Sequence, residues 1–567
     1  MRAWMARPAY ALALSLLVAG PLLGPGYLLL RDAVSTPRSY LSDTALGLTA
    51  APRATPQDFA VALASHVLDG GVVVKALLVL GLWLAGWGAA RLVAAVLPAA
   101  SGGGEFVATT VAIWNPYVAE RLLQGHWSLL VGYGCLPWVA TAMVGLRSGD
   151  AGFCGLAFWI ALAGLTPTGL ILAATVALVC VAAPGNGRPR WLSAVAALGC
   201  SVVGALPWLV ASLAGSSLRV GNEAGVDVFA PRAEPGLGTL LSLAGLGGIW
   251  NGDAVPTSRT TLFVVAAATV LLGVVAVGLP VAVRRPAARP LLLLSVAAVV
   301  LPALLATGPG LHVLRAAVDA VPGLGVLRDG QKWVALAVPG YCLAAAGAVV
   351  TLRRWLPSTV TAVVCCLVLV LVLPDLAWGA WGRVAPVRYP PGWTAVRARI
   401  NGEPGAVAVL PTGTMRRFSW SGPAPVLDPL PRWVRADVLS TGDLVISGVT
   451  VPGEGDHARA VQQLLLSGQE PSKLAAAGVA WLVVESGSPG DMGFSPRTVS
   501  SLTPAYRDND IALYRIGGRS AGAPASHRRW VLLAHFAWLA LLAAGGTGLA
   551  LRTVTDRRAR VHGANHQ

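Results

Sequence analysis

NPYVAERLLQGHW, residues 115–127, is a polar stretch between two apolar runs, and the interpretation of the whole chain starts from it. Asn115 is a favourable N-cap and Pro116 is favoured at the first helical position, so the stretch predicts a short helix. Glu120 and Gln124 are four residues apart and share one face of that helix, with Arg121 beside them. The helix therefore presents a small acidic and amide face.

Two interpretations of this helix remain open. In the first, it is an interfacial connector, anchored at the lipid headgroups by its aromatic residues Trp114, Tyr117 and Trp127. In the second, Glu120 faces a substrate cavity, because a carboxylate at the margin of the hydrocarbon is costly unless it is hydrated, paired or used. Which of the two interpretations holds depends on the side of the membrane that this stretch faces.

The composition is that of a polytopic membrane protein. The chain has 567 residues, of which 55% are apolar and 12% are charged, and its mean hydropathy is +0.66. Average soluble proteins carry about 25% charged residues. The net charge of +16 would suggest nucleic acid for a soluble protein, but these arginines lie in short connectors between apolar runs. Such placement sets membrane orientation, so we expect no nucleic-acid partner.

The cysteines and the N-terminal run also limit the function. All seven cysteines lie inside apolar runs, so we expect neither a disulfide framework nor a zinc site. The first apolar run, about residues 8–30, follows Arg2 and Arg7 and lacks a clear A-x-A site before its end. It is too long for the apolar h-region of a typical signal peptide, and we interpret it as a retained span. A cleaved signal peptide is the less favoured alternative.

Twelve apolar segments are candidate membrane spans, at about 20 residues per crossing. They cover residues 9–30, 72–98, 104–116, 127–146, 152–166, 168–184, 192–214, 261–283, 290–307, 334–352, 357–377 and 530–551. The third, fifth and sixth are short. Thr166, Pro167 and Gly169 could turn the fifth and sixth into one broken hairpin.

The basic residues predict the orientation of these spans. With a cytoplasmic N-terminus, the inner connectors contain Arg2, Arg7, Arg147, Arg188, Arg190, Arg284, Arg285, Arg289, Arg353, Arg354, Arg552, Arg557, Arg558 and Arg560. Arg528 and Arg529 are exceptions, outweighed by the four arginines after the last span. We therefore expect a plasma-membrane protein with both termini in the cytoplasm. The long loops, residues 31–71, 115–126, 215–260, 308–333 and 378–529, then lie outside.

The last outer loop is long enough for a domain. We expect strands at residues 406–410, 479–486 and 511–516 and helices at residues 457–468 and 470–478, the alternation of a small α/β unit. The predicted fold is thus α-helical and polytopic with a C-terminal extracytoplasmic α/β domain. Its parts are a membrane domain (1–377), the α/β domain (378–529), a last transmembrane helix (530–551) and a basic cytoplasmic tail (552–567).

Asp32 is the first candidate for chemistry, because it directly follows the first span. A rigid span end would hold its carboxylate at the rim of a cavity, where it could accept a proton from an attacking hydroxyl. Alternatively, it pairs with Arg31 or Arg38 at the interface. Asp58, at the start of a probable amphipathic helix in the same loop, more simply complements the N-terminus of that helix.

Further candidates for substrate binding lie in the other outer loops. VLRDGQKW, residues 326–333, contains Arg328 and Lys332, which suit a phosphate as a fork and a point charge, or serve as snorkelling anchors. We also expect His126, in the polar stretch, and Asp43, in the first loop, to bind substrate. An arginine and tryptophan cluster at residues 415–433 suits a sugar or an anionic lipid, or is an ordinary surface loop.

This layout resembles the GT-C superfamily of glycosyltransferases, which use lipid-phosphate sugars. The resemblance rests on the acid after the first span, the interfacial helix behind it, the outer loops and the C-terminal domain. KLAAAGVAWLVVES (473–486) and LTPAYRDNDIALYRI (502–516) further resemble the C-terminal domains of large bacterial members, including actinobacterial arabinofuranosyltransferase-like proteins. Many members carry adjacent acids or D-x-D in the outer loops, and this sequence has neither.

The resemblance implies a sugar transferred from a polyprenyl-phosphate donor to an envelope glycan or lipid acceptor outside the membrane. By position, Asp32 would be the general base and Glu120 an assisting acid, while Arg328 and Lys332 would hold the departing phosphate. The family often uses a divalent cation, Mg or Mn. Membrane lipids are the remaining expected partner.

Two other functions stay open. A transporter or flippase of lipid-linked substrates would need acids or broken helices at mid-membrane and symmetric halves. The spans carry almost no central acids, which disfavours it. A non-catalytic scaffold of GT-C layout in envelope assembly is the second alternative, and the missing acid pair favours it.

Overall fold

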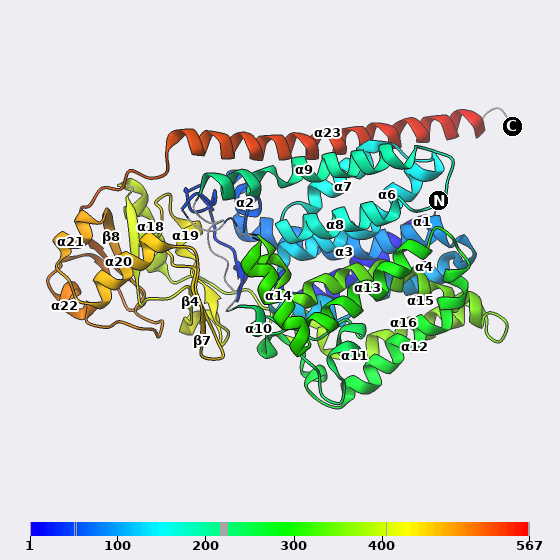
Figure 1. The fold of residues 1–567 in the computed structure, drawn as a ribbon, viewed down its shortest axis with the longest axis horizontal. Coiled ribbons are helices and arrows are strands. Elements are labelled where there is room, and N and C mark those ends of the chain that lie inside the picture. The colour runs from blue at the N-terminus through cyan, green and yellow to red at the C-terminus, as the bar shows by residue number, and fades with distance from the viewer. Residues whose placement is uncertain are drawn as a thin grey trace.

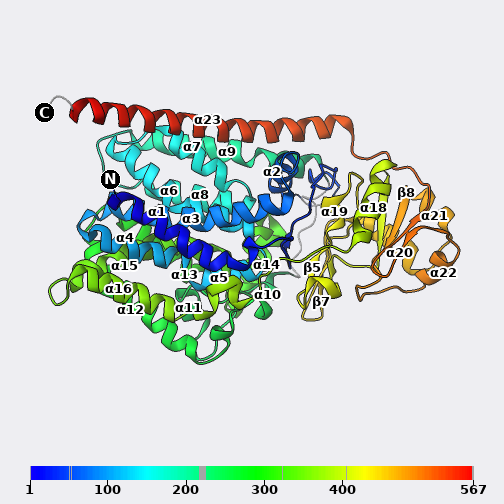
Figure 2. The same ribbon diagram turned by 180° about the vertical axis from the view of Figure 1, so that it is seen from behind.

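The structure is a computed structural model that describes residues 2–49, 52, 54–215, 225–321, 323–403 and 405–564. It is mostly helical (63%), with a few small sheets. A bundle of long helices forms the larger part, and an α/β unit lies at one end of it (Figure 1). Figures 1 and 2 place the N- and C-terminal ends together at the end of the bundle opposite to the α/β unit.

All twelve predicted apolar segments form helices, but they are not all long enough to cross a membrane. Seven segments of the described chain pass by length and composition: Met5–Leu23, Gly70–Val96, Trp127–Ser148, Arg190–Ala214, Phe263–Val283, Gly330–Leu352 and Ala525–Thr555. Two bent pairs raise the count to nine: Arg289–Leu305 with Gly308–Ala320, and Ser358–Leu371 with Pro374–Trp381. The remaining three predicted spans are helices of 11 to 14 residues. The chain therefore has seven to nine candidate spans, and the expected twelve are not confirmed.

The helices of the bundle have the following bounds. They are α1 (Arg2–Ala19), α3 (Gly70–Val96), α4 (Ser101–Ile113), α5 (Pro116–Leu123), α6 (Trp127–Ser148), α7 (Phe153–Ala163), α8 (Pro167–Cys180), α9 (Arg190–Ala214), α12 (Phe263–Val283), α13 (Arg289–Leu305), α14 (Gly308–Ala320), α15 (Val338–Leu352), α16 (Ser358–Leu371) and α23 (Ala525–Ala564). Shorter helices are α2 (Gln57–Ala64), α10 (Gly225–Val228), α11 (Thr239–Ala244) and α17 (Ala377–Trp381). A 3-10 segment, η7 (Gly330–Ala337), leads directly into α15. The last helix is longer than the predicted residues 530–551 at both ends.

Small residues let the central helices approach closely. A Cβ atom on Gly81 of α3 would lie 2.9 Å from the Leu130 carbonyl oxygen of α6, and one on Gly134 of α6 would collide with the backbone of α3. Close backbone approach is how membrane helices gain packing energy, because lipid offers no hydrophobic driving force between them. The glycines of the apolar runs thus fix the spacing of α3 and α6.

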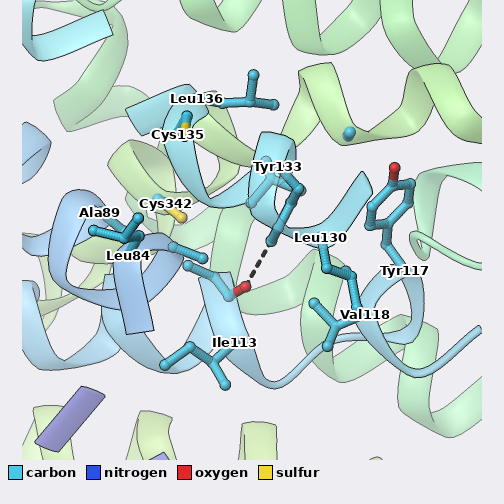
Figure 3. Close-up of a cluster of buried hydrophobic side chains, with 14 of the residues drawn as sticks. Leu84, Ala89, Ile113, Tyr117, Val118, Leu130, Tyr133, Cys135, Leu136 and Cys342 are labelled. Carbon is cyan, nitrogen blue, oxygen red and sulfur yellow. Dashed lines mark hydrogen bonds between the residues drawn. The ribbon is translucent and has the colours of Figure 1, made fainter. Parts of the chain in front are cut away.

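The polar stretch of the second outer loop lies at the centre of this packing. Asn115 caps α5 as expected, accepting a hydrogen bond from the Val118 N–H at 3.0 Å. Tyr117 and Val118 of α5 pack with Leu130 and Tyr133 of α6 in a buried cluster (Figure 3). Every residue of α5 is buried. Protein packing therefore surrounds α5 on all sides, and the re-entrant or interfacial position of this connector stays a prediction.

The first outer loop ties the bundle to the α/β unit. It begins with a hairpin of two short strands, β1 (Leu29–Leu30) and β2 (Ala33–Val34). The hairpin region also pairs with residues far along the chain. Tyr27 forms an isolated β-bridge with Val387, and Arg31 forms one with Val426. Farther on, Phe59 of α2 is buried and its ring lies 4.6 Å from that of His535 on α23. The apolar face of α2 thus packs against the last helix.

The α/β unit contains a mixed four-stranded sheet. Its order is β3-β8-β10-β9, with β3 and β8 parallel and the other pairs antiparallel. The strands are β3 (Ala406–Leu410), β8 (Val479–Val484), β9 (Pro504–Arg507) and β10 (Ala512–Arg515), and the helices are α18 (Pro391–Gly402), α19 (Leu430–Trp433), α20 (Asp456–Leu466), α21 (Pro471–Ala476) and α22 (Ser495–Ser500). Two small hairpins pair β4 (Met415–Arg416) with β5 (Val426–Leu427) and β6 (Leu444–Ile446) with β7 (Val449–Val451). The three predicted strands and two predicted helices are confirmed. The four strands of the small hairpins, β9 and three of the helices were not expected.

Asp43 links the first outer loop to the start of the last helix. Its Oδ1 accepts from Arg528 Nη1 at 2.9 Å, and its Oδ2 accepts from the Ala523 N–H, also at 2.9 Å. The Asp43 side chain is only 6% exposed, whereas that of Arg528 is 44% exposed. Both carboxylate oxygens are thus used inside the protein, which gives Asp43 a structural role.

We expect Asp43→Ala to loosen the connector before α23. The Ala523 N–H and Arg528 lose their acceptor, and charge-assisted hydrogen bonds contribute about 1.5–3 kcal/mol. Trypsin should then cleave after the exposed Arg519 roughly tenfold faster than in the unaltered protein, as measured by mass spectrometry. Asp43→Asn, which keeps an acceptor, should give an intermediate rate. An unchanged cleavage rate would contradict the structural role.

Candidate functional site

A tight hairpin turn presents Asp32. Arg31 and Asp32 are the two residues between the paired ends Leu30 and Ala33, and Arg31 has a left-handed φ of 49°. The Asp32 N–H donates to the Gln124 carbonyl oxygen at 3.2 Å, so the turn is fastened to the end of α5. Gly125 makes this contact possible: its φ is +84°, and a Cβ atom there would collide with the backbone of Leu30 and Ala33.

The polar stretch supplies the partners of the Asp32 carboxylate. Its Oδ2 accepts from Gln124 Nε2 at 3.1 Å and lies 2.8 Å from His126 Nε2. The other ring nitrogen, His126 Nδ1, lies 3.2 Å from Arg121 Nη1, which can only donate. This arrangement assigns the neutral tautomer of His126 with its proton on Nε2, donated to Asp32.

Asp32 is the exposed end of this chain of contacts. Its side chain is 36% exposed, against 17% for His126. Partial burial opposes ionisation, but the hydrogen bonds and charge of His126 and Gln124 outweigh it and hold the pKa of Asp32 below its usual range. Burial lowers the pKa of His126, and the Asp32 carboxylate opposes that shift only in part. A charged carboxylate next to a neutral imidazole can accept a proton at neutral pH.

Behind His126 lies a fully buried ion pair. Arg121 Nη1 and Nη2 donate to the two oxygens of Asp329 at 2.7 and 2.9 Å, in a bidentate arrangement. Arg121 Nη2 also donates to Gln331 Oε1. Burial opposes the charge on Asp329, yet Arg121 and Lys332 hold the pKa of its carboxyl well below the usual range. The pair joins α5 to the segment that precedes α15.

Glu120 lies at the enclosed end of the same network. Its oxygens accept from the Gly248 and Ile249 N–H groups at 3.2 and 3.0 Å, and from Gln331 Nε2 at 3.0 Å. Its side chain is 0% exposed. The expectation that Glu120 and Asp32 open onto one outward cavity therefore does not match the geometry. The position of Glu120 favours an organising role, and a part in the chemistry stays a prediction.

Of the two predicted phosphate ligands, Lys332 lies in this network. Its Nζ is 3.7 Å from Asp329 Oδ2, its side chain is 24% exposed, and its charge acts on Asp32. Arg328 points elsewhere: Nε donates to the Gly325 carbonyl oxygen at 3.0 Å and the guanidinium lies 5.5 Å from the ring centre of Phe229. The structure thus brings together Asp32, His126 and Lys332. It directs the side chains of Asp43 and Arg328 to other partners.

Several site residues were not expected from the sequence. Gln331 bridges Arg121 and Glu120, and Asn251 Nδ2 donates to Gln124 Oε1 at 2.7 Å. Gln331 lies in the stretch VLRDGQKW, two residues after Asp329. Its polar side chain in this stretch could have marked it as a site residue. Asn251 carries no such signal, because its partner is 127 residues away. The expected pairing of Asp32 with Arg31 or Arg38 is wrong, since both arginines donate to other groups.

A divalent cation held by the protein alone does not fit the donor set. Among the residues that the structure describes, no group of three or more His, Cys, Asp or Glu side chains is close enough to hold a metal. Asp32 already accepts two hydrogen bonds at Oδ2. The expected Mg or Mn ion stays a prediction, and no chemical step is derived through it.

Comparison with known proteins shows the fold. The chain is similar to the cryo-EM structure of arabinofuranosyltransferase AftD from Mycobacteria, with a TM-score of 0.59 and 17% identity over 92% of this chain and 40% of that chain. A structure of a point mutant of that enzyme gives a TM-score of 0.55 and 17% identity over 92% of this chain and 42% of that chain. Comparisons with protein-family models and with curated sequences found no match.

The similarity agrees with the predicted resemblance to arabinofuranosyltransferase-like proteins at the level of the fold. At 17% identity it shows the fold alone. The chain spans about 40% of the length of that enzyme, so its activity and substrates belong to the proposals below.

Glu120 makes stability depend on pH. Burial, and then the neighbouring Glu234 carboxylate, raise the pKa of Glu120 from its ordinary 4.5 to about 8, against the opposing charge of Arg259. The folded state therefore holds this proton more tightly than the unfolded state. The resulting stability is complete below pH 4.5 and is lost as the pH rises through about 8.

We expect the thermal midpoint of the protein in detergent to fall between pH 5 and pH 9. Glu120→Gln, which is neutral at every pH, should show a shallower decrease over the same interval. Glu470→Gln, which changes an exposed carboxylate, is the matched control and should follow the unaltered protein. Equal slopes for all three proteins would rule out the shift of Glu120.

The buried ion pair gives a second test of the site. Arg121→Gln or Asp329→Asn leaves the partner charge uncompensated, which costs about 3–5 kcal/mol. The double variant should recover part of that loss, as measured by denaturant unfolding of the four proteins. Arg315→Gln removes one partner of an exposed pair with Asp227 and should cost at most about 1 kcal/mol. Additive losses in the double variant would contradict the coupling.

Proposed function

We propose that this chain is an integral-membrane glycosyltransferase that uses Asp32 as its general base. The donor is a polyprenyl-phosphate-linked sugar, and the acceptor is a glycan or lipid of the cell envelope. The fold likeness to a GT-C glycosyltransferase supports the class of reaction. The donor, the acceptor and the face of the membrane are part of the proposal.

One observation carries it: Asp32 is a partly exposed carboxylate in the turn of the hairpin that follows the first span, nine residues after Leu23, where that span ends. Its surroundings keep it charged while one of its oxygens is held by His126 and Gln124. No hydrogen bond is assigned to Oδ1 in the described part of the chain, so that oxygen is available to an incoming hydroxyl. A general base needs both the charge and an oxygen within hydrogen-bond reach.

The step itself conserves atoms and charge. The acceptor hydroxyl oxygen forms a bond with the anomeric carbon and gives its proton to Asp32. The bond between the anomeric carbon and the phosphate oxygen breaks, and its electron pair leaves with the lipid phosphate. A nearby cation stabilises the growing negative charge of that phosphate. Lys332, whose charge already acts on Asp32, is one candidate, and Arg328 is the other one predicted from sequence.

Glu120 acts at a distance in this proposal. Together with Gln331 it fixes Arg121, and Arg121 in turn orients the His126 ring toward Asp32. A positioning residue of this kind keeps the base within a fraction of an ångström of its working geometry. This chain lacks the adjacent acids that many members of the family carry. In our proposal Asp32 alone faces the substrate, and Glu120 holds the residues that position Asp32.

The proposed membrane orientation follows the arginine distribution. Both ends of the chain lie at the end of the bundle away from the α/β unit (Figure 2). The positive-inside rule assigns that end to the cytoplasm. Asp32 is then on the outer side of the plasma membrane, where a lipid-linked sugar and an envelope acceptor can meet.

The test is a transfer assay with the full chain in lipid nanodiscs, given radiolabelled polyprenyl-phosphate sugars and envelope acceptors. We expect Asp32→Asn to lower kcat by at least about 100-fold, the usual contribution of a general base. Asp58→Asn is the matched control in the same loop, since Asp58 pairs with Arg432 at 3.1 Å. It should keep its activity. Transfer that survives in Asp32→Asn would overturn the proposal, and no transfer with any donor would favour the non-catalytic scaffold.

His126→Asn separates positioning from catalysis. Losing the imidazole removes a hydrogen bond that keeps the Asp32 carboxylate charged, so the pKa of Asp32 moves up toward its usual range. The acidic limb of the kcat/KM profile should therefore move to higher pH, while the alkaline side changes little. A uniform loss at every pH would instead indicate a purely structural effect.

A further inference from the structure

Three arginines from three parts of the chain lie near one another, and one of them, Arg31, precedes Asp32 in the hairpin turn. Arg31 comes from the first hairpin, Arg383 from the segment after α17, and Arg417 from the segment after β4. Arg31 Nη2 and Arg383 Nη2 both donate to the same oxygen, the Asp253 carbonyl. Arg417 donates to the Pro423 carbonyl oxygen, two residues from Pro425, whose own carbonyl accepts from the Arg31 N–H.

The charge of this arginine cluster is poorly compensated. None of the three guanidinium groups forms a salt bridge with the residues that the structure describes. Asp253 and Asp32 act on Arg31 electrostatically, and Asp375 acts on Arg383, but Asp375 is engaged by Ser258. Like charges at such short range repel, and the arrangement is favourable when an anion lies between them.

Two details show unused binding capacity. Arg31 is 5% exposed, and its Nε is buried without a hydrogen-bond partner in the described structure. A buried N–H group without a protein partner can donate to a bound anion. Burial, and then Arg383 and Arg417, lower the pKa of Arg31. Arg383 and Arg417 are themselves exposed and so can be reached from outside.

Neither predicted phosphate ligand offers the same capacity. The Lys332 ammonium lies 3.7 Å from the Asp329 carboxylate, and the Arg328 guanidinium lies against the Phe229 ring. Arginine is also the better partner for phosphate, because its planar donors match two oxygens at once. The cluster therefore exceeds Lys332 in charge that no carboxylate compensates, with both Nη atoms of Arg31 and of Arg383 held by backbone carbonyl oxygens.

We propose that Arg31, Arg383 and Arg417 form a binding site for the phosphate group of a lipid phosphate, reached from the hairpin turn that also carries the base Asp32. This inference rests on the proposed function and makes it more specific, because the departing phosphate of the donor would lie among these arginines. Arg417 belongs to the α/β unit, so that unit completes the site and does more than cover it. A free phosphate ion carries the same chemistry, and the experiment separates the two sources.

The experiment uses the full chain in phosphatidylcholine nanodiscs, with 32P-labelled farnesyl phosphate as the probe and empty discs as the background. We expect saturable binding that Arg383→Gln and Arg417→Gln each weaken roughly threefold to tenfold. Both side chains are exposed, so neither variant disturbs the core. Arg507→Gln removes the same charge from the far edge strand of the same unit and should bind as the unaltered protein does. Arg328→Gln is measured alongside, because Arg328 is the alternative phosphate ligand predicted from sequence.

Competition identifies the source of the phosphate. Displacement of the probe by unlabelled farnesyl phosphate but not by millimolar inorganic phosphate supports a lipid phosphate. Displacement by inorganic phosphate at the same concentration shows that the site takes free phosphate and overturns the lipid assignment. Displacement by farnesol, which lacks the phosphate, also overturns it.

The variants decide whether the cluster is the site. Unchanged binding in Arg383→Gln and Arg417→Gln, or an equal loss in Arg507→Gln, would overturn the proposal. A loss in Arg328→Gln alone would assign the phosphate to that residue instead.

Failure of this inference differs from failure of the proposed function. If both cluster variants transfer sugar with unchanged kcat and KM for the donor, the phosphate site is wrong while the enzyme stands. If the cluster binds farnesyl phosphate as expected and no donor supports transfer, the site stands and the glycosyltransferase proposal fails.

Discussion

A guanidinium buried away from water must be matched by acceptors, and Arg121 finds them in Asp329 and Gln331. The pair has fixed geometry because both nitrogens meet both carboxylate oxygens. That contact holds α5 against η7, and α5 in turn holds the turn that presents Asp32. The apolar bundle therefore contains a polar layer, with an enclosed end at Glu120 and an open end at Asp32.

Local sequence patterns predicted many of the helices and strands. The N-cap at Asn115, the positions of the apolar helices and the strands and helices at residues 406–410, 457–486 and 511–516 all follow from short-range signals, namely capping, hydropathy and alternation. The same signals brought out Asp32, His126 and Lys332, because each is a polar residue at the edge of an apolar run. The expected partners of Asp32 were Glu120 and Arg328 or Lys332; the structure places His126 and Lys332 near it, while Glu120 is enclosed.

Contacts between residues far apart in the sequence could not be predicted from it. Glu120 was expected to face a cavity, but its partners Gly248 and Ile249 come from a loop 128 residues or more away and enclose it completely. Bends of 92° after α13 and 73° after α16 interrupt two expected spans, and α4, α7 and α8 have only 13, 11 and 14 residues. Arg31 had no local pattern to distinguish it, since its role comes from contacts with residues 253, 383 and 425.

The backbone pairing of Arg31 has a consequence for biogenesis. Its N–H and carbonyl group bond to Pro425 and Leu427, almost 400 positions downstream. During synthesis the chain must therefore be extended through Leu427 before the hairpin can dock in its final register. Until then the turn that carries Asp32 is held by earlier parts of the chain, among them Gln124 and His126, and chain connectivity delays the completion of this part of the structure.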